Sequence, residues 1–265
     1  MATVDSKSYT DIDEALTYWA TNGGTLKLLQ NAEFPKEGAD GKKKAITITA
    51  SNAVLDLNGK KLTASVSQAL TVKGGQLTIK GDQDESVYES TASAPVWVEE
   101  GGSVTLESGT ITAPGGTAYG VVGVKKKDAS FVMNGGTINC TGNGYGLYLL
   151  GATESKRNSA TINGGTITSV AEAIYMKDST TLQVNGTPVI GKISVNTSAT
   201  RYIANLEING GIIDDLVVNI KKLGTFTISE SARFKSDISK ALTSTTYSCV
   251  KTDDGYYKAQ VITAD

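Results

Sequence analysis

The chain contains no histidine, and its 265 residues include only two cysteines, four prolines and three arginines. The absence of histidine excludes the Ser-His-Asp and Cys-His catalytic mechanisms and removes the commonest metal ligand. Cys140 and Cys249 stand 109 residues apart and form no CxxC pair. We interpret them as two small buried side chains, and not as a disulfide or a zinc site.

Long hydrophobic runs and a strong excess of charge are absent too. No apolar run approaches the ~18 residues of a membrane-spanning helix, and the opening MATVDSKSYT lacks the pattern of a signal peptide. The net charge is −2 and the pI is about 5.4, which argues against a nucleic-acid-binding protein. We expect no nucleic-acid partner, no membrane insertion, no resident metal and no cofactor.

What the sequence does contain is a strand-and-turn unit that recurs along most of its length. Clear copies are SVTLESGTITA, SFVMNGGTINC, SATINGGTITS and LEINGGIIDD. Repeats with a period of 20–50 residues are typical of solenoid folds. The aligned turn positions are Asn58, Lys80, Glu107, Asn134, Asn163, Asn185 and Asn209, separated by 22, 27, 27, 29, 22 and 24 residues.

A second strand unit alternates with the first. Its copies are QALTVK, APVWVE, YGVVGV, YGLYLL and EAIYMK. Two strand types that alternate with one common period predict a coil: an all-β, right-handed parallel β-helix of about eight turns, stacked ~4.8 Å apart. The central residues are Thr71, Trp97, Val122, Tyr148 and Tyr175, separated by 26, 25, 26 and 27 residues.

Within both units apolar residues alternate with polar ones, as in a strand with one buried face. We expect the apolar set to point into the coil. In the turn unit these residues are Leu55/Leu57, Leu77/Ile79, Val104/Leu106, Phe131/Met133, Ala160/Ile162, Leu182/Val184 and Leu206/Ile208; in the second unit they are Leu70/Val72, Val96/Val98, Leu147/Leu149 and Ile174/Met176.

The Asn-Gly turns fit sharp corners between sheets, because Asn and Gly both tolerate the left-handed backbone conformation. Stacked asparagines also hydrogen-bond from one turn to the next. We therefore interpret Asn134, Asn163, Asn185 and Asn209 as a structural ladder. The competing interpretation, in which each Asn-Gly is a two-residue hairpin turn, fits the alternation of two units less well.

The open ends of a coil need caps. Residues 5–24 fit an N-terminal helical cap that begins with a capping-box-like pair, Thr10 and Asp13, and places Trp19 in the core. The coils should occupy residues 25–234, followed at 235–265 by a β-hairpin cap around Asp253-Asp254-Gly255. No linker divides the chain, so we expect one domain, 1–265.

The segments SYTDIDEALTYWATNGGTLKLL and ITITASNAVLDLNGKKLTA, together with the repeated NGGTI corners, resemble a known type of module over residues 4–260. The chain resembles the right-handed, pectate-lyase-like β-helix modules of surface or secreted proteins of Gram-positive bacteria. That resemblance implies an extracellular location and an adhesive or carbohydrate-binding role. It does not itself supply an activity.

Because the same fold group includes polysaccharide lyases and glycoside hydrolases, catalysis is an alternative. The hydrolases of the group share a Gly-His-Gly element, which a chain without histidine lacks, and only Asp214-Asp215 matches their paired aspartates. Hydrolysis needs two carboxylates across the scissile bond. The outward candidates, which the spacing does not bring together, are Asp56, Glu172, Asp178, Glu207, Asp214 and Asp215.

The best candidate for a binding surface is a stripe of aromatic side chains. Trp97, Tyr148 and Tyr175 hold equivalent positions with Val122 on successive coils, and Tyr119 and Tyr145 flank them. Exposed aromatic rings on a flat sheet would bind sugar rings or apolar side chains of a protein. Stacking between neighbouring coils without any ligand remains the alternative.

Two charged segments have alternative interpretations as well. The loop with Asp82, Asp84 and Glu85 is either solvated or a weak calcium site. The runs Lys42–Lys44 and Lys125–Lys127 are either solvated loops or attract anionic glycans.

From these patterns we expect a non-catalytic extracellular module that binds a glycan or a host or cell-surface protein, as a monomer within a larger polypeptide. A polysaccharide-cleaving enzyme and a rigid stalk are the alternatives.

Overall fold

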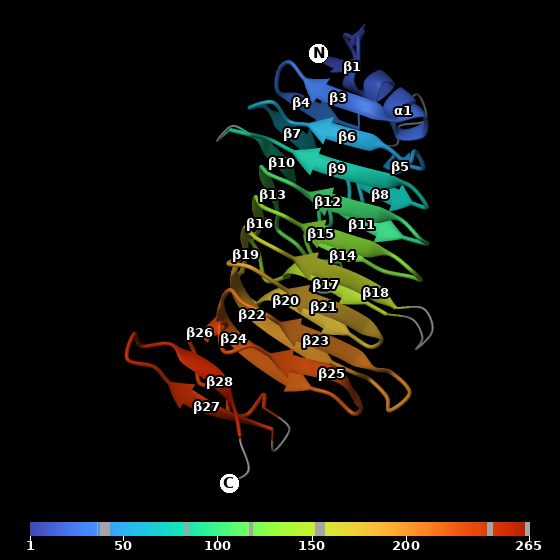
Figure 1. Ribbon diagram of the computed structural model, residues 1–265. Helices are drawn as coiled ribbons and strands as arrows, with labels where there is room; N and C mark the ends of the chain where they lie inside the picture. Colours follow the sequence, from blue (N-terminus) through green and yellow to red (C-terminus); the bar gives the residue numbers. More distant parts are fainter. Residues whose placement is uncertain are drawn as a thin grey trace.

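Successive copies of the repeat lie beside one another in parallel register, so the chain winds into a β-solenoid of about seven turns (Figure 1). The computed structural model describes residues 1–35, 37, 43–82, 85–116, 119–151, 157–242 and 246–262. With 51% strand and 5% helix, it confirms the expected all-β parallel β-helix, with about seven turns where the sequence predicts eight. The hairpin interpretation is wrong, because neighbouring repeats pair in parallel, as in Val104↔Phe131.

Each turn contributes strands to three faces. The first face is an eleven-stranded sheet in which every pair from β3 onward is parallel. Its strands are β1 (Ala2–Val4), β2 (Lys7–Tyr9), β3 (Gly24–Leu28), β6 (Ala53–Asp56), β9 (Gln76–Lys80), β12 (Ser103–Leu106), β15 (Ser130–Met133), β18 (Asn158–Ile162), β21 (Thr180–Val184), β23 (Ala204–Ile208) and β25 (Leu223–Ile228).

The second and third faces join into one seventeen-stranded sheet, because β22 (Val189–Asn196) and β24 (Ile212–Asn219) run across both. The second face comprises β4 (Ala32–Phe34), β7 (Lys61–Ala64), β10 (Val87–Ser90), β13 (Thr110–Ala113), β16 (Thr137–Cys140), β19 (Thr166–Ser169) and β26 (Arg233–Phe234). The third face comprises β5 (Ile46–Ile48), β8 (Leu70–Lys73), β11 (Val96–Glu99), β14 (Val122–Val124), β17 (Tyr145–Leu150) and β20 (Glu172–Lys177).

The core fills the space between the three faces. Every residue that the alternation predicts to point inward is buried, and none is more than 1% exposed. Burial of each such Leu or Ile side chain contributes about 1.5–3 kcal/mol, and this repeated contribution holds the coil together. Cys140 is buried as expected, Cys249 is half-buried, and both are free thiols.

Two registers differ from the sequence alignment. On the first face Asp56, and not Asn58, pairs with Lys80, so this turn spans 24 residues and not the 22 of the sequence alignment. On the third face Gly123, and not Val122, pairs with Trp97 and Tyr148. Val122 instead points into the core.

The asparagine ladder is confirmed. Each side-chain Nδ2 donates to the Oδ1 of the asparagine one turn earlier: Asn163 to Asn134 at 2.8 Å, Asn185 to Asn163 at 3.0 Å, and Asn209 to Asn185 at 2.9 Å. The corner itself bends at glycines such as Gly136, where φ is +77°. The left-handed conformation therefore falls on the glycine and not on these asparagines.

The N-terminal cap consists of α1 (Ile12–Asn22) and a short hairpin. Asp11, and not Thr10, is the N-cap, and its side chain accepts a hydrogen bond from the Asp13 N–H at 2.8 Å. Trp19 is fully buried, as expected. The hairpin of β1 and β2 was not predicted, and β1 pairs antiparallel with β3. Among the described residues no helix has the length and hydrophobicity needed to cross a membrane.

The C-terminal end carries the predicted hairpin, formed by β27 (Tyr247–Lys251) and β28 (Tyr257–Val261). It extends the second face, because Phe234 of β26 pairs antiparallel with Tyr257. The ring of Tyr247 also reaches β25, where its hydroxyl accepts a long hydrogen bond from the Ile228 N–H at 3.5 Å. The hairpin thereby covers part of the open end of the coil.

Candidate functional site

The predicted aromatic residues lie on the outer side of the third face, on four consecutive turns. Cα pairing runs from Trp97 through Gly123 to Tyr148 and Tyr175, and then to Ser194. These side chains point outward because their neighbours, such as Val96 and Val98, point into the core. Strand alternation therefore places Trp97, Tyr148 and Tyr175 in one column along the solenoid axis, and Tyr119 and Tyr145 lie beside it.

Trp97 is held at one end of this column by contacts on every side. Its indole extends over Gly123 of the next turn, where a side chain would overlap the six-membered ring. The ring of Tyr119 packs edge-on against it, with centroids 5.5 Å apart, and the Lys125 ammonium lies 5.7 Å from the ring centre. The indole N–H donates to Glu99 Oε2 at 3.2 Å. Trp97 is consequently only 2% exposed.

Three tyrosines form a stacked group at the other end of the column. The rings of Tyr145 and Tyr175 are nearly parallel, with an interplanar angle of 6° and centroids 4.4 Å apart. Tyr148 lies against both rings, at 5.5 Å from Tyr145 and 5.8 Å from Tyr175. Tyr148 is 5% exposed, whereas Tyr145 and Tyr175 are half-buried. Tyr145 and Tyr175 therefore form the accessible part of the group.

The surroundings of the tyrosines favour their neutral phenols. Burial raises the pKa of Tyr148 to about 12, and the nearby Tyr175, Tyr145 and Asp178 add to this effect. Burial also raises the pKa of Tyr145 and of Tyr175, with a further contribution from the Glu172 carboxylate. At neutral pH the group therefore presents uncharged hydroxyls that both donate and accept hydrogen bonds.

Charged residues border the tyrosines. The Lys192 ammonium pairs with Glu172 Oε1 at 3.4 Å, and both side chains are partly exposed. Asp178 is buried, and its Oδ1 accepts hydrogen bonds from the N–H and the hydroxyl of Ser198, each at 2.7 Å. Asp178 thus fixes the backbone beside the site, while Glu172 and Lys192 remain accessible to a ligand.

The structure corrects the expectation of an open aromatic stripe. Trp97 and Tyr148 lie in the predicted column but are covered, because neighbouring side chains pack onto them. Tyr119, at 37% exposure, and the half-buried Tyr145 and Tyr175 are the members that solvent reaches. Val122 is wrong as a member of the stripe, since Gly123 occupies that position. The five aromatic side chains together are called the aromatic cluster below: Trp97, Tyr119, Tyr145, Tyr148 and Tyr175.

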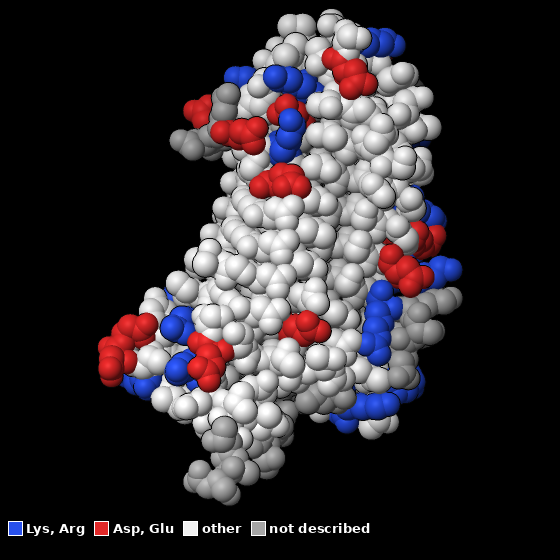
Figure 2. Space-filling model, in the orientation of Figure 1, with Lys and Arg blue, Asp and Glu red and all other residues white. Residues whose placement is uncertain are grey.

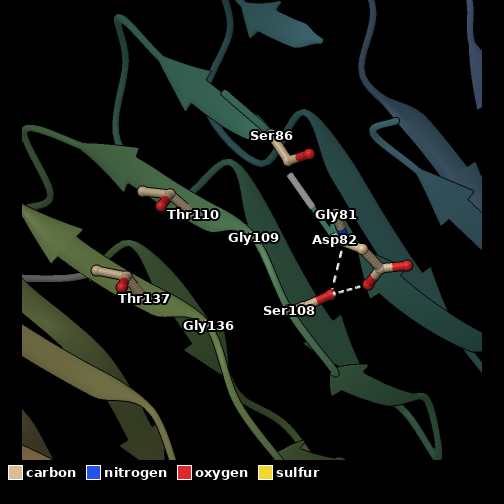
Figure 3. Close-up of a pocket in the computed structure, with 8 residues that line it drawn as sticks. All are labelled: Gly81, Asp82, Ser86, Ser108, Gly109, Thr110, Gly136 and Thr137. Atoms are coloured by element: carbon tan, nitrogen blue, oxygen red, sulfur yellow. Dashed lines mark hydrogen bonds between the residues drawn. The ribbon is translucent and has the colours of Figure 1, made fainter. Parts of the chain in front are cut away.

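A separate cavity of about 310 Å³ lies at the corner where the first face turns into the second (Figure 3). It contains hydroxyls, glycine backbone and a single carboxylate. Asp82 Oδ1 accepts a hydrogen bond from the Ser108 hydroxyl at 2.8 Å, and the Ser108 Oγ accepts one from the Gly81 N–H at 3.0 Å. The lining residues are Gly81, Asp82, Ser86, Ser108, Gly109, Thr110, Gly136 and Thr137.

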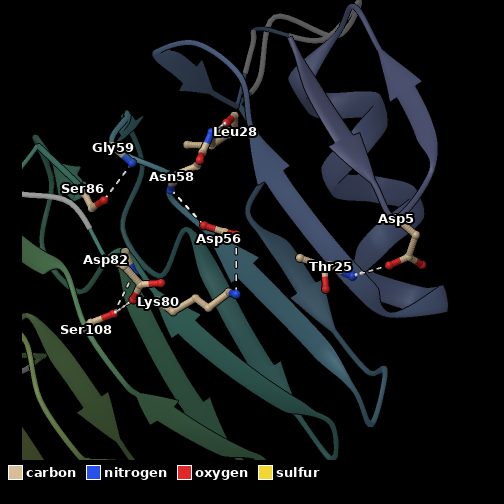
Figure 4. Close-up of polar contacts among 11 residues, drawn as sticks. Asp5, Thr25, Leu28, Asp56, Asn58, Gly59, Lys80, Asp82, Ser86 and Ser108 are labelled. Carbon is tan, nitrogen blue, oxygen red and sulfur yellow. Dashed lines mark hydrogen bonds and ion pairs between the residues drawn. The ribbon is translucent and has the colours of Figure 1, made fainter.

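Around this corner, side chains tie each turn to the next (Figure 4). The Ser86 hydroxyl accepts a hydrogen bond from the Gly59 N–H at 2.9 Å, and Lys80 pairs with Asp56 at 3.6 Å. The Nδ2 of Asn58 donates to the Leu28 carbonyl at 2.8 Å. The polar side chains of this corner therefore form hydrogen bonds and an ion pair between neighbouring turns, which hold the turns together.

The calcium hypothesis gains no support at this corner. Asp84 lies outside the described residues, Glu85 is exposed, and Asp82 bonds Ser108. Within the described ranges no three Cys, Asp or Glu side chains come close enough to hold a metal ion.

The charged groups weighed for catalysis or binding mostly have structural partners. Glu207 accepts a hydrogen bond from Gln183 at 2.9 Å, Asp214 pairs with Lys235 at 2.6 Å, and Asp215 lies in register with Lys192. Of the first lysine run, Lys42 lies outside the described residues, and Lys43 donates to the Ser65 hydroxyl at 2.9 Å.

The sequence reasoning missed the ionic network beside Trp97. Lys126 contacts Glu99 at 2.8 Å and Glu100 at 3.2 Å, and Lys73 contacts Glu100 at 2.9 Å. These pairs lower the pKa of Glu100 and raise that of Lys126. The sequence could have predicted this network, because residues of opposite charge follow the third-face strand on three neighbouring turns: Lys73, then Glu99 and Glu100, then Lys126.

A scan against protein-family models, a search of curated proteins and a search of solved structures each found no match to this chain. The site must therefore be interpreted from its own geometry.

Proposed function

We propose that the chain is a non-catalytic, extracellular carbohydrate-binding module, and that the aromatic cluster is its binding surface. The observation that carries this proposal is the gathering of five aromatic side chains, from four consecutive turns, on one outer face. Partly exposed tyrosine rings, each with an apolar face and a polar hydroxyl, suit the mixed apolar and polar surface of a sugar ring.

The arrangement provides both a support and a contact surface. Trp97 and Tyr148 are buried and fix the positions of Tyr119 and of the stacked pair Tyr145 and Tyr175. Because these contacting rings are held in place, a ligand would lose little side-chain entropy on binding. The ion pair of Glu172 with Lys192 at the border provides a hydrogen-bond acceptor and a donor for sugar hydroxyls.

The parallel solenoid and the NGGTI corners support a more specific assignment. We propose a pectate-lyase-like module of a Gram-positive surface or secreted protein, acting in adhesion to a glycan or to a glycan-bearing cell or host surface. The support for this origin is the sequence pattern together with the solenoid fold.

A glycan array followed by calorimetry tests the function. We expect the wild-type chain to bind at least one glycan, and Tyr119→Ala together with Tyr175→Ala to weaken that binding at least about tenfold, because both rings are accessible. Tyr18→Ala is the matched control, since Tyr18 is 44% exposed but lies on α1. Circular dichroism checks that each variant is folded. Unchanged binding by the double variant would contradict the assignment of the cluster.

A rigid stalk is the second candidate. The observation that favours it is the face-to-face contact of Tyr145 and Tyr175, since rings that stack on each other stabilise neighbouring turns without a ligand. A stalk predicts no glycan binding by the wild type and a lower melting temperature for the tyrosine variants.

A further inference from the structure

Charge is unevenly distributed over the three corners of the solenoid. The described residues of the connections from the third face back to the first include seven Lys or Arg and three Asp or Glu, a net +4, whereas the whole chain carries −2. These described residues are 49–52, 74–75, 100–102, 125–129, 151, 157, 178–179, 197–203 and 220–222.

The other two corners differ in charge. The described connections from the first face to the second carry four carboxylates and one lysine: Asp82, Glu85, Glu107, Glu230 and Lys60. The described residues of the connections from the second face to the third that follow β7, β10, β13, β16 and β19 carry no charge. In Figure 2 several Lys and Arg lie along the right-hand margin, next to a group of Asp and Glu, while the middle of the visible surface carries only scattered acidic residues. One corner is therefore selectively basic.

Four lysines in or next to the basic corner, called the basic edge below, have no carboxylate within ion-pair distance among the described residues: Lys127, Lys221 and Lys222 in the connections, and Lys177 at the end of β20. Lys177 is half-buried and the other three are exposed. By contrast, Lys73 and Lys126 are neutralised by Glu99 and Glu100. The charge of the basic edge is thus available to a ligand.

The basic edge follows the axis of the solenoid. The Lys127 carbonyl accepts a hydrogen bond from the Gly101 N–H of the preceding turn at 3.1 Å, and the Lys177 carbonyl accepts one from the Gly151 N–H at 3.0 Å. Lys127 follows β14, Lys177 is the last residue of β20, and the pair Lys221-Lys222 follows β24, so each step spans two turns. At ~4.8 Å per turn, cationic groups recur about every 10 Å along the axis of this corner, with Lys177 two residues before the positions equivalent to Lys127 and Lys221.

The basic edge also adjoins the aromatic cluster. Lys177 comes two residues after Tyr175 on the outer side of β20, roughly 7 Å along the strand. At the other end of the cluster, the neighbouring Lys125 lies over the Trp97 ring. A chain that contacted the accessible tyrosines would therefore run beside a row of ammonium groups.

We propose that the ligand of this module is a linear anionic polysaccharide, bound along the solenoid axis with its acidic groups on the basic edge and its sugar rings on the aromatic cluster. This inference rests on the proposed carbohydrate-binding function and adds the charge and direction of the ligand. Acidic groups that recur along the polymer engage several turns at once, so individually weak contacts combine into a higher avidity.

The probes are chosen to separate the sources of negative charge. They are polygalacturonate for carboxylate, heparin for sulfate and phosphomannan for phosphodiester, with dextran as the neutral polymer and duplex DNA as the non-glycan polyanion. We expect at least one anionic glycan to bind more than about tenfold tighter than dextran and DNA. Its affinity should fall steeply with added salt, because bound counterions are released.

The decisive variant is the triple change Lys177→Gln, Lys221→Gln and Lys222→Gln. It should weaken anionic-glycan binding at least about tenfold and reduce the slope of log affinity against log salt by about two to three. Lys27→Gln, Lys60→Gln and Lys240→Gln together make the same change in net charge away from the basic edge, and this control should bind as the wild type does.

The outcomes distinguish the two levels of the proposal. Equal binding of dextran and the acidic polymers, with no effect of the edge variant, would overturn the anionic ligand and leave the carbohydrate-binding function standing. Equal binding of DNA would show a general attraction for polyanions and would also overturn it. Failure to bind any glycan in the array or in this set would overturn both.

Discussion

The indole of Trp97 lies directly over Gly123, its Cα partner on the next turn of the solenoid. A side chain at position 123 would overlap the Cζ3 and Cε3 atoms of the ring. The position of the Trp97 ring in the aromatic cluster therefore requires that residue 123 has no side chain. Gly123 does not adopt the left-handed conformation, so space alone requires glycine here.

Gly123→Ala should displace the Trp97 ring and destabilise the protein by about 1–3 kcal/mol, the usual range for overpacking. Chemical denaturation measures the free energy of unfolding, and the fluorescence of Trp97, isolated in a Trp19→Phe background, reports the ring. Gly116→Ala is the matched control in a nearby loop, because its nearest contact would be an ordinary 3.4 Å. Equal stability of the two variants would show that the indole relocates at no cost.

Much of the fold could be predicted because each turn repeats the same physical requirement. The alternating apolar residues of every turn have to be buried on the same side of the strand. Once the period of the repeat is known, this requirement predicts which residues of neighbouring turns pair, such as Val104 with Phe131. The asparagine ladder follows for the same reason, since side chains at equivalent corners fall within hydrogen-bond reach. The β1–β2 hairpin has no counterpart in the repeat and was missed.

The aromatic site was only partly predictable. Its column was correct apart from position 122, where YGVVGV offers two adjacent residues and alternation fixes the register only to within one residue. The burial of Trp97 and Tyr148 was not predictable, because it depends on how Tyr119, Lys125 and Tyr145 pack over them. The periodicity of a strand determines which way a side chain points, but not what covers it.

Substitution of an asparagine inside the ladder should lower the free energy of unfolding more than substitution of the asparagine at its end. Asn163→Ala breaks two side-chain hydrogen bonds, to Asn134 and Asn185, whereas Asn209→Ala breaks only the one to Asn185. At about 0.5–1.5 kcal/mol for each bond, and toward the lower value because these residues are exposed, we expect losses of about 1 and about 0.5 kcal/mol. Urea unfolding measures both, and equal losses would argue against coupling along the ladder.

The stacked pair Tyr145 and Tyr175 should show a direct coupling energy. Rings 4.4 Å apart and nearly parallel stabilise each other by about 0.5–1.5 kcal/mol beyond the area they bury. A double-mutant cycle of Tyr145→Ala, Tyr175→Ala and the double variant isolates this energy from the free energies of unfolding. Strict additivity of the two single changes would mean that the stack contributes nothing to stability.

The raised pKa of Tyr148 predicts a loss of stability in alkaline solution. An unfolded tyrosine ionises near pH 10, whereas burial and the neighbouring Tyr175, Tyr145 and Asp178 raise the pKa in the folded chain to about 12. The neutral Tyr148 phenol therefore makes its full contribution to the free energy of unfolding below pH ~10, and this contribution is lost as the pH rises toward 12. The loss should amount to about 2–3 kcal/mol.

Tyr148→Phe removes the phenol and keeps the ring, so its free energy of unfolding should fall less steeply than that of the wild type from about pH 10 to about pH 12. Urea unfolding across this range measures the difference, and tyrosinate absorbance follows the ionisation itself. Tyr18→Phe is the control, because it deletes a phenol that is 44% exposed. Parallel pH profiles for the wild type and Tyr148→Phe would contradict the raised pKa and with it the tight packing of Tyr148 beneath the accessible rings.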